Sequence, residues 1–483
     1  MNRRGFLRGA LASAAAVAAY SPTRGVWAAK PEPDTIAIPD LDGALVLAGS
    51  LLDDAADDFG HIISAAPVAV LIPGSVDDIR KLIKFANKHD IKVGGMSMIG
   101  NTHSTYGQSQ VGGGVVIDMS ALSEIHEIGA DYAVVDAGVR WIELLQETLV
   151  EGKSPPTLTD YIDLSIGGTA SVGGIGGQAF RHGLQVDNFL EFEVVTGQGK
   201  LVTCSPTKHK KLFHAVRAGL GQFAIIVRAR VRLVDVPPMA RMYHAFYDDV
   251  AAMTADQEMV VDDDRFDYVE GFAEADPQGS GWIYKIELVK YYTPGDEPDD
   301  AALVGDLNHN PGTEVVTDMP YFDFANRIAP LVAFLQQIGA WGLPHPWIDM
   351  FVPGDVVNGF VQDVLDQTTL ADTGQGPIII YPFKRAKVTA PFMALPEGEN
   401  CYLFSILRTA VPPELAGQLV AKNRAIYEDL RDLGGKRYAI SSIPFDPQDW
   451  HDHFGDQWWD FAIAKLKYDP KNFLSPGQGI FCW

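Results

Sequence analysis

Two segments of the chain hold the residue types that bind large ligands or move protons. Residues 100–108 read Gly-Asn-Thr-His-Ser-Thr-Tyr-Gly-Gln, with His103 and Ser104 between two glycines. Glycine allows the backbone to approach a ligand closely and leaves N–H groups available for phosphate oxygens. Residues 159–178 begin with Thr-Asp-Tyr and continue into a run dense in glycine. That much glycine costs conformational entropy, which close approach to a large cofactor would offset; a tight structural crossover is the alternative interpretation.

Several common catalytic motifs are missing from the sequence. Residues 152–154 read Gly-Lys-Ser but lack the upstream glycine of a P-loop, and no H-E-x-x-H zinc helix occurs. Residues 95–97 begin like a nucleophile elbow, but Ile99 stands where glycine is required. Cys204, Cys401 and Cys482 are too far apart in sequence for a C-x-x-C redox or zinc motif. A strand-turn-helix G-x-G-x-x-G dinucleotide fingerprint is also missing from the N-terminal region. Hydrolase, kinase and nicotinamide chemistry therefore have no support, and we expect no metal site.

Short strands alternate with helices in the first half of the chain. Apolar runs predict strands at residues 68–72, 115–119, 133–136 and 223–227, and helical periodicity appears at 76–89 and 141–150. This alternation is typical of a mixed α/β or α+β domain. Residues 237–238, a Pro-Pro pair, mark a plausible domain boundary.

The chain changes character after this boundary. Strand-like segments at 242–247, 281–291 and 402–408 occur with helical stretches at 330–338 and 413–433. The last fifty residues are aromatic-rich and then glycine-ended, which suggests that they fold back onto the first domain. The residues alone therefore predict a mixed α/β or α+β fold with two or three domains.

Composition and charge narrow the possible functions. The 483 residues include 62 acidic and 38 basic side chains, giving a net charge of −24. Such a surface repels phosphate backbones and anionic lipid, so we expect no nucleic-acid partner. Beyond the N-terminus no apolar run reaches the ~18 residues that span a bilayer, so no integral membrane anchor is expected.

The first 28 residues resemble an export signal. Arg3 and Arg4 precede Phe-Leu and an alanine-rich run, and residues 26–28 offer a small-x-small cleavage site. Adjacent arginines in this position are typical of a twin-arginine signal, whereas an ordinary secretory signal is the alternative. We therefore expect a periplasmic or secreted protein.

Taken together, the two candidate ligand-binding segments, residues 100–108 and 159–178, are similar to the motifs of a known family. The chain resembles the flavin-dependent oxidases of the vanillyl-alcohol-oxidase superfamily, and within it the cytokinin dehydrogenases. Residues 100–108 correspond to the family's G-R-G-H-S-x-x-G-Q, and residues 158–162 to its W-T-D-Y-L. Further matches run in order along the chain, at residues 177–183, 194–197, 219–223, 266–271, 344–347, 350–353, 381–382 and 475–481.

The resemblance implies an α+β flavoprotein with two domains. A discontinuous FAD-binding domain would comprise residues 40–236 and 431–483, and a cap domain, built on an antiparallel sheet with helices, residues 237–430. FAD would be linked covalently through His103. Asp160 would be the catalytic base, and Glu270 a carboxylate near the pocket entrance that binds an adenine ring. Other implied cofactor contacts are Gly100, Asn101, Thr102, Ser104, Gln108, Asp160, Ser165, Ser171, Ile175, Ile225, Ile226, Tyr438, Ser475 and Gln478.

These implied roles suit the oxidation of a secondary amine. Flavin accepts a hydride from carbon, and a carboxylate such as Asp160 accepts the proton from nitrogen. The resulting imine hydrolyses, so an N6-isoprenoid adenine would give adenine and an unsaturated aldehyde. A quinone-like compound or oxygen would reoxidise the flavin.

Three positions depart from the family's pattern, and alternative interpretations of the site and the function stay open. Asn101 and Thr102 replace the family's arginine and glycine before the histidine, so an unlinked flavin is possible, and Leu158 replaces a tryptophan beside the base. By itself Asp160 would be read as a helix cap or turn residue, and Glu270 as a solvated strand-end acid. The alternative functions are a same-fold oxidase of a sugar, lactone or alcohol, and a non-catalytic flavin- or purine-binding protein.

Overall fold

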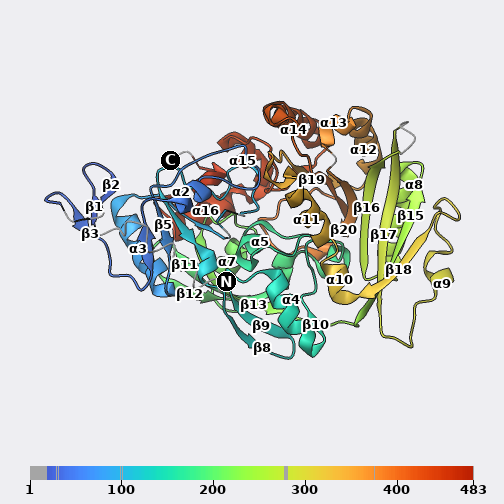
Figure 1. The fold of residues 1–483 in the computed structure, drawn as a ribbon, viewed down its shortest axis with the longest axis horizontal. Helices are drawn as coiled ribbons and strands as arrows, with labels where there is room; N and C mark the ends of the chain where they lie inside the picture. Colours follow the sequence, from blue (N-terminus) through green and yellow to red (C-terminus); the bar gives the residue numbers. More distant parts are fainter. Residues whose placement is uncertain are drawn as a thin grey trace.

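The chain forms two domains that lie beside each other along its long axis (Figure 1). The computed structural model describes residues 19–28, 30, 32–97, 99–100, 102–276, 281–374 and 376–481. Two main sheets of four and five strands build the first domain, together with the small pairings β2-β1-β3 and β10-β14, and one eight-stranded sheet builds the second. The predicted α+β class is confirmed.

The smaller sheet of the first domain has four strands in the order β4-β5-β7-β6. Strands β5, β7 and β6 are parallel and β4 is antiparallel to β5. Helix α3 connects β5 to β6, and its apolar residues Ile79, Leu82, Ile83 and Ala86 are buried along one face. The bounds are β4 (Ala44–Val46), α2 (Ser50–Ala55), β5 (Ala69–Ile72), α3 (Val76–His89), β6 (Val93–Met96) and β7 (Val115–Asp118).

The second sheet of this domain is antiparallel, in the order β12-β11-β13-β9-β8. One continuous apolar core joins it to the first sheet and to helix α4. Its elements and neighbours are β8 (Ile125–Ile128), β9 (Tyr132–Asp136), α4 (Trp141–Thr148), β10 (Lys153–Ser154), α5 (Ile166–Val172), α6 (Ala179–His182), β11 (Phe189–Thr196), β12 (Leu201–Cys204), α7 (Lys210–Val216), β13 (Ala224–Arg232) and β14 (Val234–Asp235).

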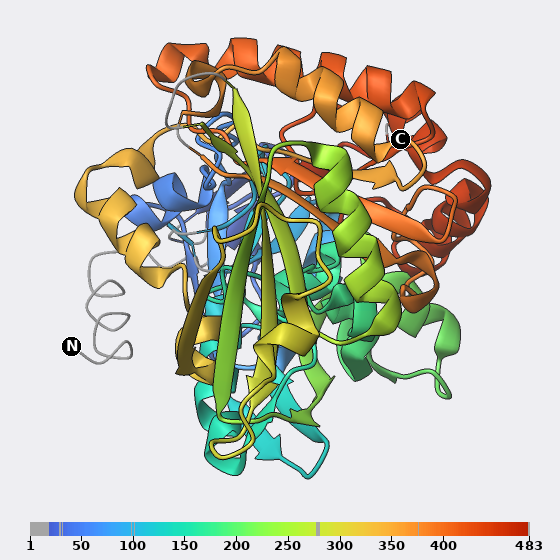
Figure 2. The ribbon, with the colours of Figure 1, turned by 90° about the vertical axis from the view of Figure 1, so that its right-hand side faces the viewer.

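The second domain is an eight-stranded antiparallel sheet in the order β18-β15-β17-β16-β20-β21-β19-β22. The strands are β15 (Met239–Tyr247), β16 (Tyr268–Ala275), β17 (Trp282–Tyr292), β18 (Val315–Pro320), β19 (Ile348–Pro353), β20 (Ile378–Lys384), β21 (Asn400–Ile406) and β22 (Lys436–Arg437). The helices are α8 (Val250–Asp263), α9 (Asp300–Val304), α10 (Tyr321–Ala325), α11 (Ala329–Gln337), α12 (Val357–Asp366), α13 (Leu370–Thr373) and α14 (Ala416–Asp432). Figure 2 shows α8, in yellow-green, lying across the sheet.

Side chains alternate in direction along each strand, so the two faces of the large sheet pack against different parts of the molecule. On β20, Ile378 and Ile380 pack with α8, α12 and α14, whereas Ile379 and Tyr381 pack toward the first domain. Successive side chains of a strand point to opposite faces, so one strand serves both interfaces. The inner face of the sheet therefore forms a wall opposite the first domain.

After β22 the chain returns to the first domain. Helices α15 (Pro447–Phe454) and α16 (Trp458–Tyr468) supply Trp450, Phe454 and Phe461 to a core that includes Phe223. Residue 430, the predicted end of the cap domain, falls inside α14 and before β22, which pairs with β19.

Residues 1–18 of the predicted leader, with Arg3 and Arg4, lie outside the described residues, as do Asn101 and Cys482. Residues 19–28 contain β1 (Ala19–Ser21) and β2 (Val26–Ala28), and β1 also pairs with β3 (Ile36–Ala37). The Tyr20 ring contacts Phe85 of α3 edge-on, with ring centres 5.9 Å apart. In the described part of the chain, no helix combines the length and apolarity needed to cross a membrane.

Candidate active site

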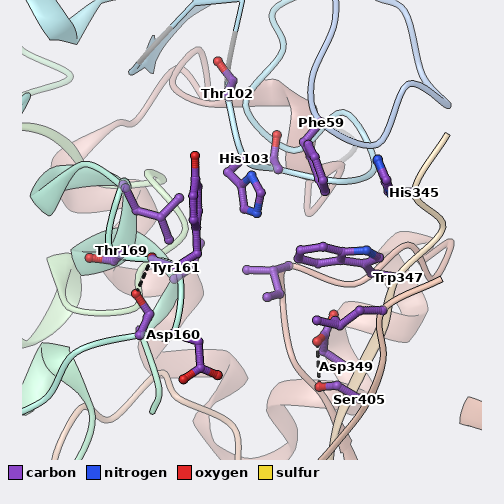
Figure 3. A pocket seen from close by; sticks show the side chains of 18 of the residues that line it. Phe59, Thr102, His103, Asp160, Tyr161, Thr169, His345, Trp347, Asp349 and Ser405 are labelled. Carbon is purple, nitrogen blue, oxygen red and sulfur yellow. Dashed lines mark hydrogen bonds between the residues drawn. The ribbon is translucent and has the colours of Figure 1, made fainter. Parts of the chain in front are cut away.

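A cavity of about 1100 Å³ lies between the two domains. The first domain contributes the segment after β6, the α5 region and part of β13, and the second contributes α11, β19, β20 and β21. Ordinary small-molecule pockets measure roughly 300–1000 Å³. The cavity is therefore large enough for a sizeable ligand, and His103 and Asp160 both line it (Figure 3).

The segment that carries His103 follows β6 and is held by a buried carboxylate. Asp58 Oδ2 accepts hydrogen bonds from Ser104 Oγ at 2.9 Å and from the Gly107 N–H at 2.7 Å. Burial raises the pKa of Asp58 to about 6, although these hydrogen bonds oppose the shift. Gln108 ties the same segment to the C-terminal region, because its side-chain amide donates to the Ile440 carbonyl at 3.1 Å. These contacts fix the backbone on both sides of His103.

Aromatic rings surround the His103 imidazole. It stacks on Phe59 with ring centres 4.2 Å apart, and the rings of Tyr161 and Trp347 lie 4.9 and 5.2 Å away. Burial, together with the nearby His345, lowers the pKa of His103 to about 3, so the ring is neutral at pH 7. Nδ1 is buried and has no hydrogen-bond partner among the described residues. A neutral ring with an unsatisfied nitrogen is suited to bonding a ligand in the cavity.

Asp160 lies on another part of the cavity wall, and two donors hold it. The Tyr268 hydroxyl donates to Asp160 Oδ1 at 2.6 Å, and Arg327 Nη2 donates to the same oxygen at 2.7 Å. About a quarter of the Asp160 side chain is exposed. Both donors come from the second domain, so the position of this carboxylate depends on the contact between domains.

Arg327 joins three carboxyl groups. Its Nε donates to Glu287 Oε1 at 2.8 Å, and its Nη2 lies 3.3 Å from Glu270 Oε2. Burial raises the pKa of Glu287, but Arg327 and a hydrogen bond with His244 outweigh it and lower the value to about 2. Burial and the neighbouring Asp160 raise the pKa of Glu270 well above its usual range, despite Arg327. The guanidinium thus faces an ionised Glu287, whereas ionisation of Glu270 is disfavoured.

The location predicted for Glu270 differs from the observed one. The sequence analysis placed this carboxylate near the pocket entrance, whereas its side chain is fully buried and is not part of the cavity lining. The cause is its place on β16, where it lies opposite Glu287 of β17, behind Arg327. Its role in binding an adenine ring remains a prediction.

Most of the other predicted contacts do line the cavity. They are Thr102, Ser104, Gln108, Ser165, Ser171, Ile175, Ile225, Ile226, Tyr438, Ser475 and Gln478. Several also fix the backbone: Ser165 caps α5, and Tyr438 accepts a hydrogen bond from the Gly174 N–H at 3.0 Å. Gly100 is not part of the lining, and Asn101 lies outside the described residues.

Sequence reasoning missed Asp58, Glu287 and Arg327. Each is one charged residue in an ordinary-looking segment, and only the fold brings them to the site. Tyr161 and Trp347 could have been expected at the site from the sequence, because both lie within segments matched to the family.

The cavity fits FAD on two observations. The unsatisfied Nδ1 of His103 and the unsatisfied Oε1 of Gln478 are both buried polar atoms of residues that line it. Buried polar atoms are rarely left without partners, so a polar ligand is expected between them. Gly95, Gly167, Gly168, Gly174 and Gly221 also line the cavity, which allows close approach of a large cofactor to the backbone.

Solved structures support this assignment at the level of the fold. 6-Hydroxy-D-nicotine oxidase from Arthrobacter nicotinovorans superposes with a TM-score of 0.69 at 19% identity, covering 91% of this chain and 98% of that one. A VAO-type flavoprotein from Myceliophthora thermophila C1 gives 0.65 at 18% identity, covering 85% and 79%. The fold of this chain is thus similar to that of VAO-type flavoproteins.

Sequence comparison identifies the protein family to which the chain belongs. Residues 67–205 match the model of an FAD binding domain, and residues 274–481 match that of "Cytokinin dehydrogenase 1, FAD and cytokinin binding". Cytokinin dehydrogenase 5 of Oryza sativa subsp. japonica is 37% identical over 91% of each chain. An uncharacterized oxidoreductase of the fasciation locus of Rhodococcoides fascians is 38% identical over 88% of this chain and 96% of that one. The chain belongs to the cytokinin dehydrogenase family of FAD-dependent oxidoreductases.

Proposed function

We propose that this protein oxidatively cleaves N6-isoprenoid adenines to adenine and an unsaturated aldehyde. Family membership supports an FAD-dependent reaction, and the cavity supports a small organic substrate. The observation that carries the proposal is the Asp160 carboxylate, which reaches the cavity wall while Tyr268 and Arg327 hold it. A carboxylate fixed in this way is suited to accept a proton from a substrate nitrogen.

In this reaction the carbon beside the nitrogen loses a hydride, and the nitrogen loses a proton. When bound, FAD supplies the acceptor for the hydride and its two electrons. Asp160 accepts the proton, which leaves a C=N bond in the substrate. Water then adds to this bond, and the C–N bond breaks to release the aldehyde and adenine. A well-placed base typically contributes ~10²–10⁴-fold to the rate.

Residues around Asp160 keep it in place for this step. Arg327 supplies a positive charge beside the carboxylate, and Tyr268 fixes one of its oxygens. Burial and the neighbouring Asp160 raise the pKa of Glu270, which disfavours a second negative charge beside the base. Asp160 is therefore the carboxyl group of this cluster that both Tyr268 and Arg327 hold at the cavity wall.

We also propose a covalent link between His103 and FAD. The neutral imidazole has a lone pair available at pH 7, and its buried Nδ1 lacks another partner among the described residues. We further propose export from the cytoplasm, on the residues 1–28 pattern, and reoxidation by a quinone-like compound or oxygen.

Product analysis tests the proposed reaction. Purified holoprotein is mixed with isopentenyladenine and a quinone, and adenine and the unsaturated aldehyde are both quantified. We expect equal amounts of the two products. Turnover of a sugar, lactone or alcohol in place of the adenine would favour another oxidase of this fold, and no turnover of any compound would favour a binding role.

A further inference from the structure

One buried carboxyl group in the cavity wall has no part in the proposed chemistry. Asp349 lies on β19, two residues after Trp347, and only 3% of it is exposed. Its Oδ1 accepts a hydrogen bond from Ser405 Oγ at 2.7 Å, shown as a dashed line in Figure 3. Its Oδ2 is buried and has no hydrogen-bond partner among the described residues.

The surroundings of Asp349 do not compensate for this free oxygen. Among the described residues, no lysine, arginine or histidine forms an ion pair with it. Burial raises the pKa of Asp349 to about 7, although hydrogen bonds with Ser405 and Ser441 oppose the shift. A buried acceptor without a partner costs free energy, and the cavity is the side from which a partner can come.

Asp349 lies in a buried part of the cavity lining, which we call the interior part. Apolar side chains that are about half exposed form the solvent-side rim of the cavity, namely Leu331, Phe334, Ile338, Leu370 and Val411. Figure 3 shows Asp160 and Asp349 on two sides of the cavity, with Trp347 above Asp349. A secondary amine with its nitrogen at Asp160 directs one substituent to the rim and the other to the interior.

The rim and the interior part suit different parts of the substrate. The half-exposed apolar rim suits the flat faces of a purine, and the buried wall at Trp347 and Asp349 suits the other substituent of the amine. A hydrocarbon side chain would leave Oδ2 unsatisfied. A side chain with a hydroxyl group would donate a hydrogen bond to it.

We propose that Asp349 recognises a hydroxyl group on the N6 substituent, so that this enzyme prefers hydroxylated side chains to hydrocarbon ones. This inference rests on the proposed function and specifies its substrate. A site built to pair a substrate hydroxyl discriminates against analogues that lack it, because the buried polar group of the site is then left unpaired. We expect a preference of roughly 10–100-fold in kcat/KM.

The test compares kcat/KM for isopentenyladenine and its terminally hydroxylated analogue, with a quinone as acceptor. The wild type should favour the hydroxylated compound, and Asp349→Leu should lower the ratio of the two values at least tenfold. Asp349→Asn keeps the shape and presents an amide N–H that can donate a hydrogen bond to the hydroxyl oxygen, so it should retain most of the preference. Asp256→Asn is the matched control: this buried aspartate, bonded to Tyr247 and Asn308 of the second domain, lies outside the cavity lining, so the ratio should not change.

Flavin content and the visible flavin spectrum are recorded for every variant. An unchanged ratio in Asp349→Leu would overturn the inference while leaving the proposed function in place. Loss of flavin, or a shifted flavin spectrum at an unchanged ratio, would overturn it in favour of a cofactor contact. If the wild type oxidises neither compound, the proposed function and this inference both fail.

Discussion

Arg327 Nη2 lies 2.7 Å from Asp160 Oδ1, while Nε of the same guanidinium lies 2.8 Å from Glu287 Oε1. Asp160 belongs to the first domain, and Glu287 lies on β17 of the second. One arginine thus links the proposed base to the large sheet. The position of the base is set by the contact between the domains as well as by its own loop.

Replacing Arg327 tests this link. Arg327→Met should lower kcat by roughly 10–100-fold, because a hydrogen bond to a charged group contributes about 1.5–3 kcal/mol. The effect should fall on kcat more than on KM if the arginine positions the base. Arg241→Met is a suitable control, since Arg241 pairs with Asp318 on the same sheet but lies outside the cavity lining. Equal kinetics in the two variants would contradict the link.

Tyr268 provides a milder test of the same contact. Tyr268→Phe removes the 2.6 Å hydrogen bond to Asp160 but keeps the ring, which packs on Phe324. We expect kcat to fall about tenfold with little change in melting temperature, because Arg327 still holds the carboxylate. Steady-state kinetics and a thermal scan check this; a large drop in melting temperature with unchanged kcat would assign Tyr268 a purely structural role.

The covalent link can be tested without measuring turnover. Wild-type protein should keep its flavin fluorescence on a denaturing gel, and His103→Gln should lose it. His345→Gln, which alters the other ring stacked on Phe59, should keep the fluorescent band. A wild-type protein that releases all its flavin on denaturation would show that FAD binds here without a covalent bond.

Asp349 gives a prediction about stability and pH. Its pKa is about 7 in the folded protein, against a usual value of 3.8, so the folded state binds the proton more tightly. The contribution of this group to the free energy of unfolding is therefore largest below pH 4. It is lost as the pH rises to about 7, at about 1.4 kcal/mol per pH unit. Asp349→Asn does not titrate, so its stability relative to the wild type should increase between pH 5 and pH 8. Denaturant unfolding at both pH values measures this, and an equal difference at both would refute it.

The sequence predicted the elements better than the site. Helix α3 and strand β5 have strong local patterns, and the observed bounds lie within a residue or two of the predicted ones. The segments around His103 and Asp160 were identifiable because glycine and chemically active side chains occur together there. Arg327 had no such pattern, since it follows α10 and reaches Asp160 only through the packing of the two domains. For the same reason burial of Glu270 could not be predicted, because it depends on the strands on either side of β16.

The central claim is that Asp160 accepts a proton while the substrate is oxidised at the flavin. Anaerobic mixing of the holoprotein with isopentenyladenine, followed by the visible flavin absorption, tests it most directly. We expect rapid bleaching in the wild type and a bleaching rate ~10²–10⁴-fold lower in Asp160→Asn, with flavin content unchanged. Equal bleaching rates in the two proteins would contradict the role of Asp160, and a flavin that stays oxidised in the wild type would contradict the proposed substrate.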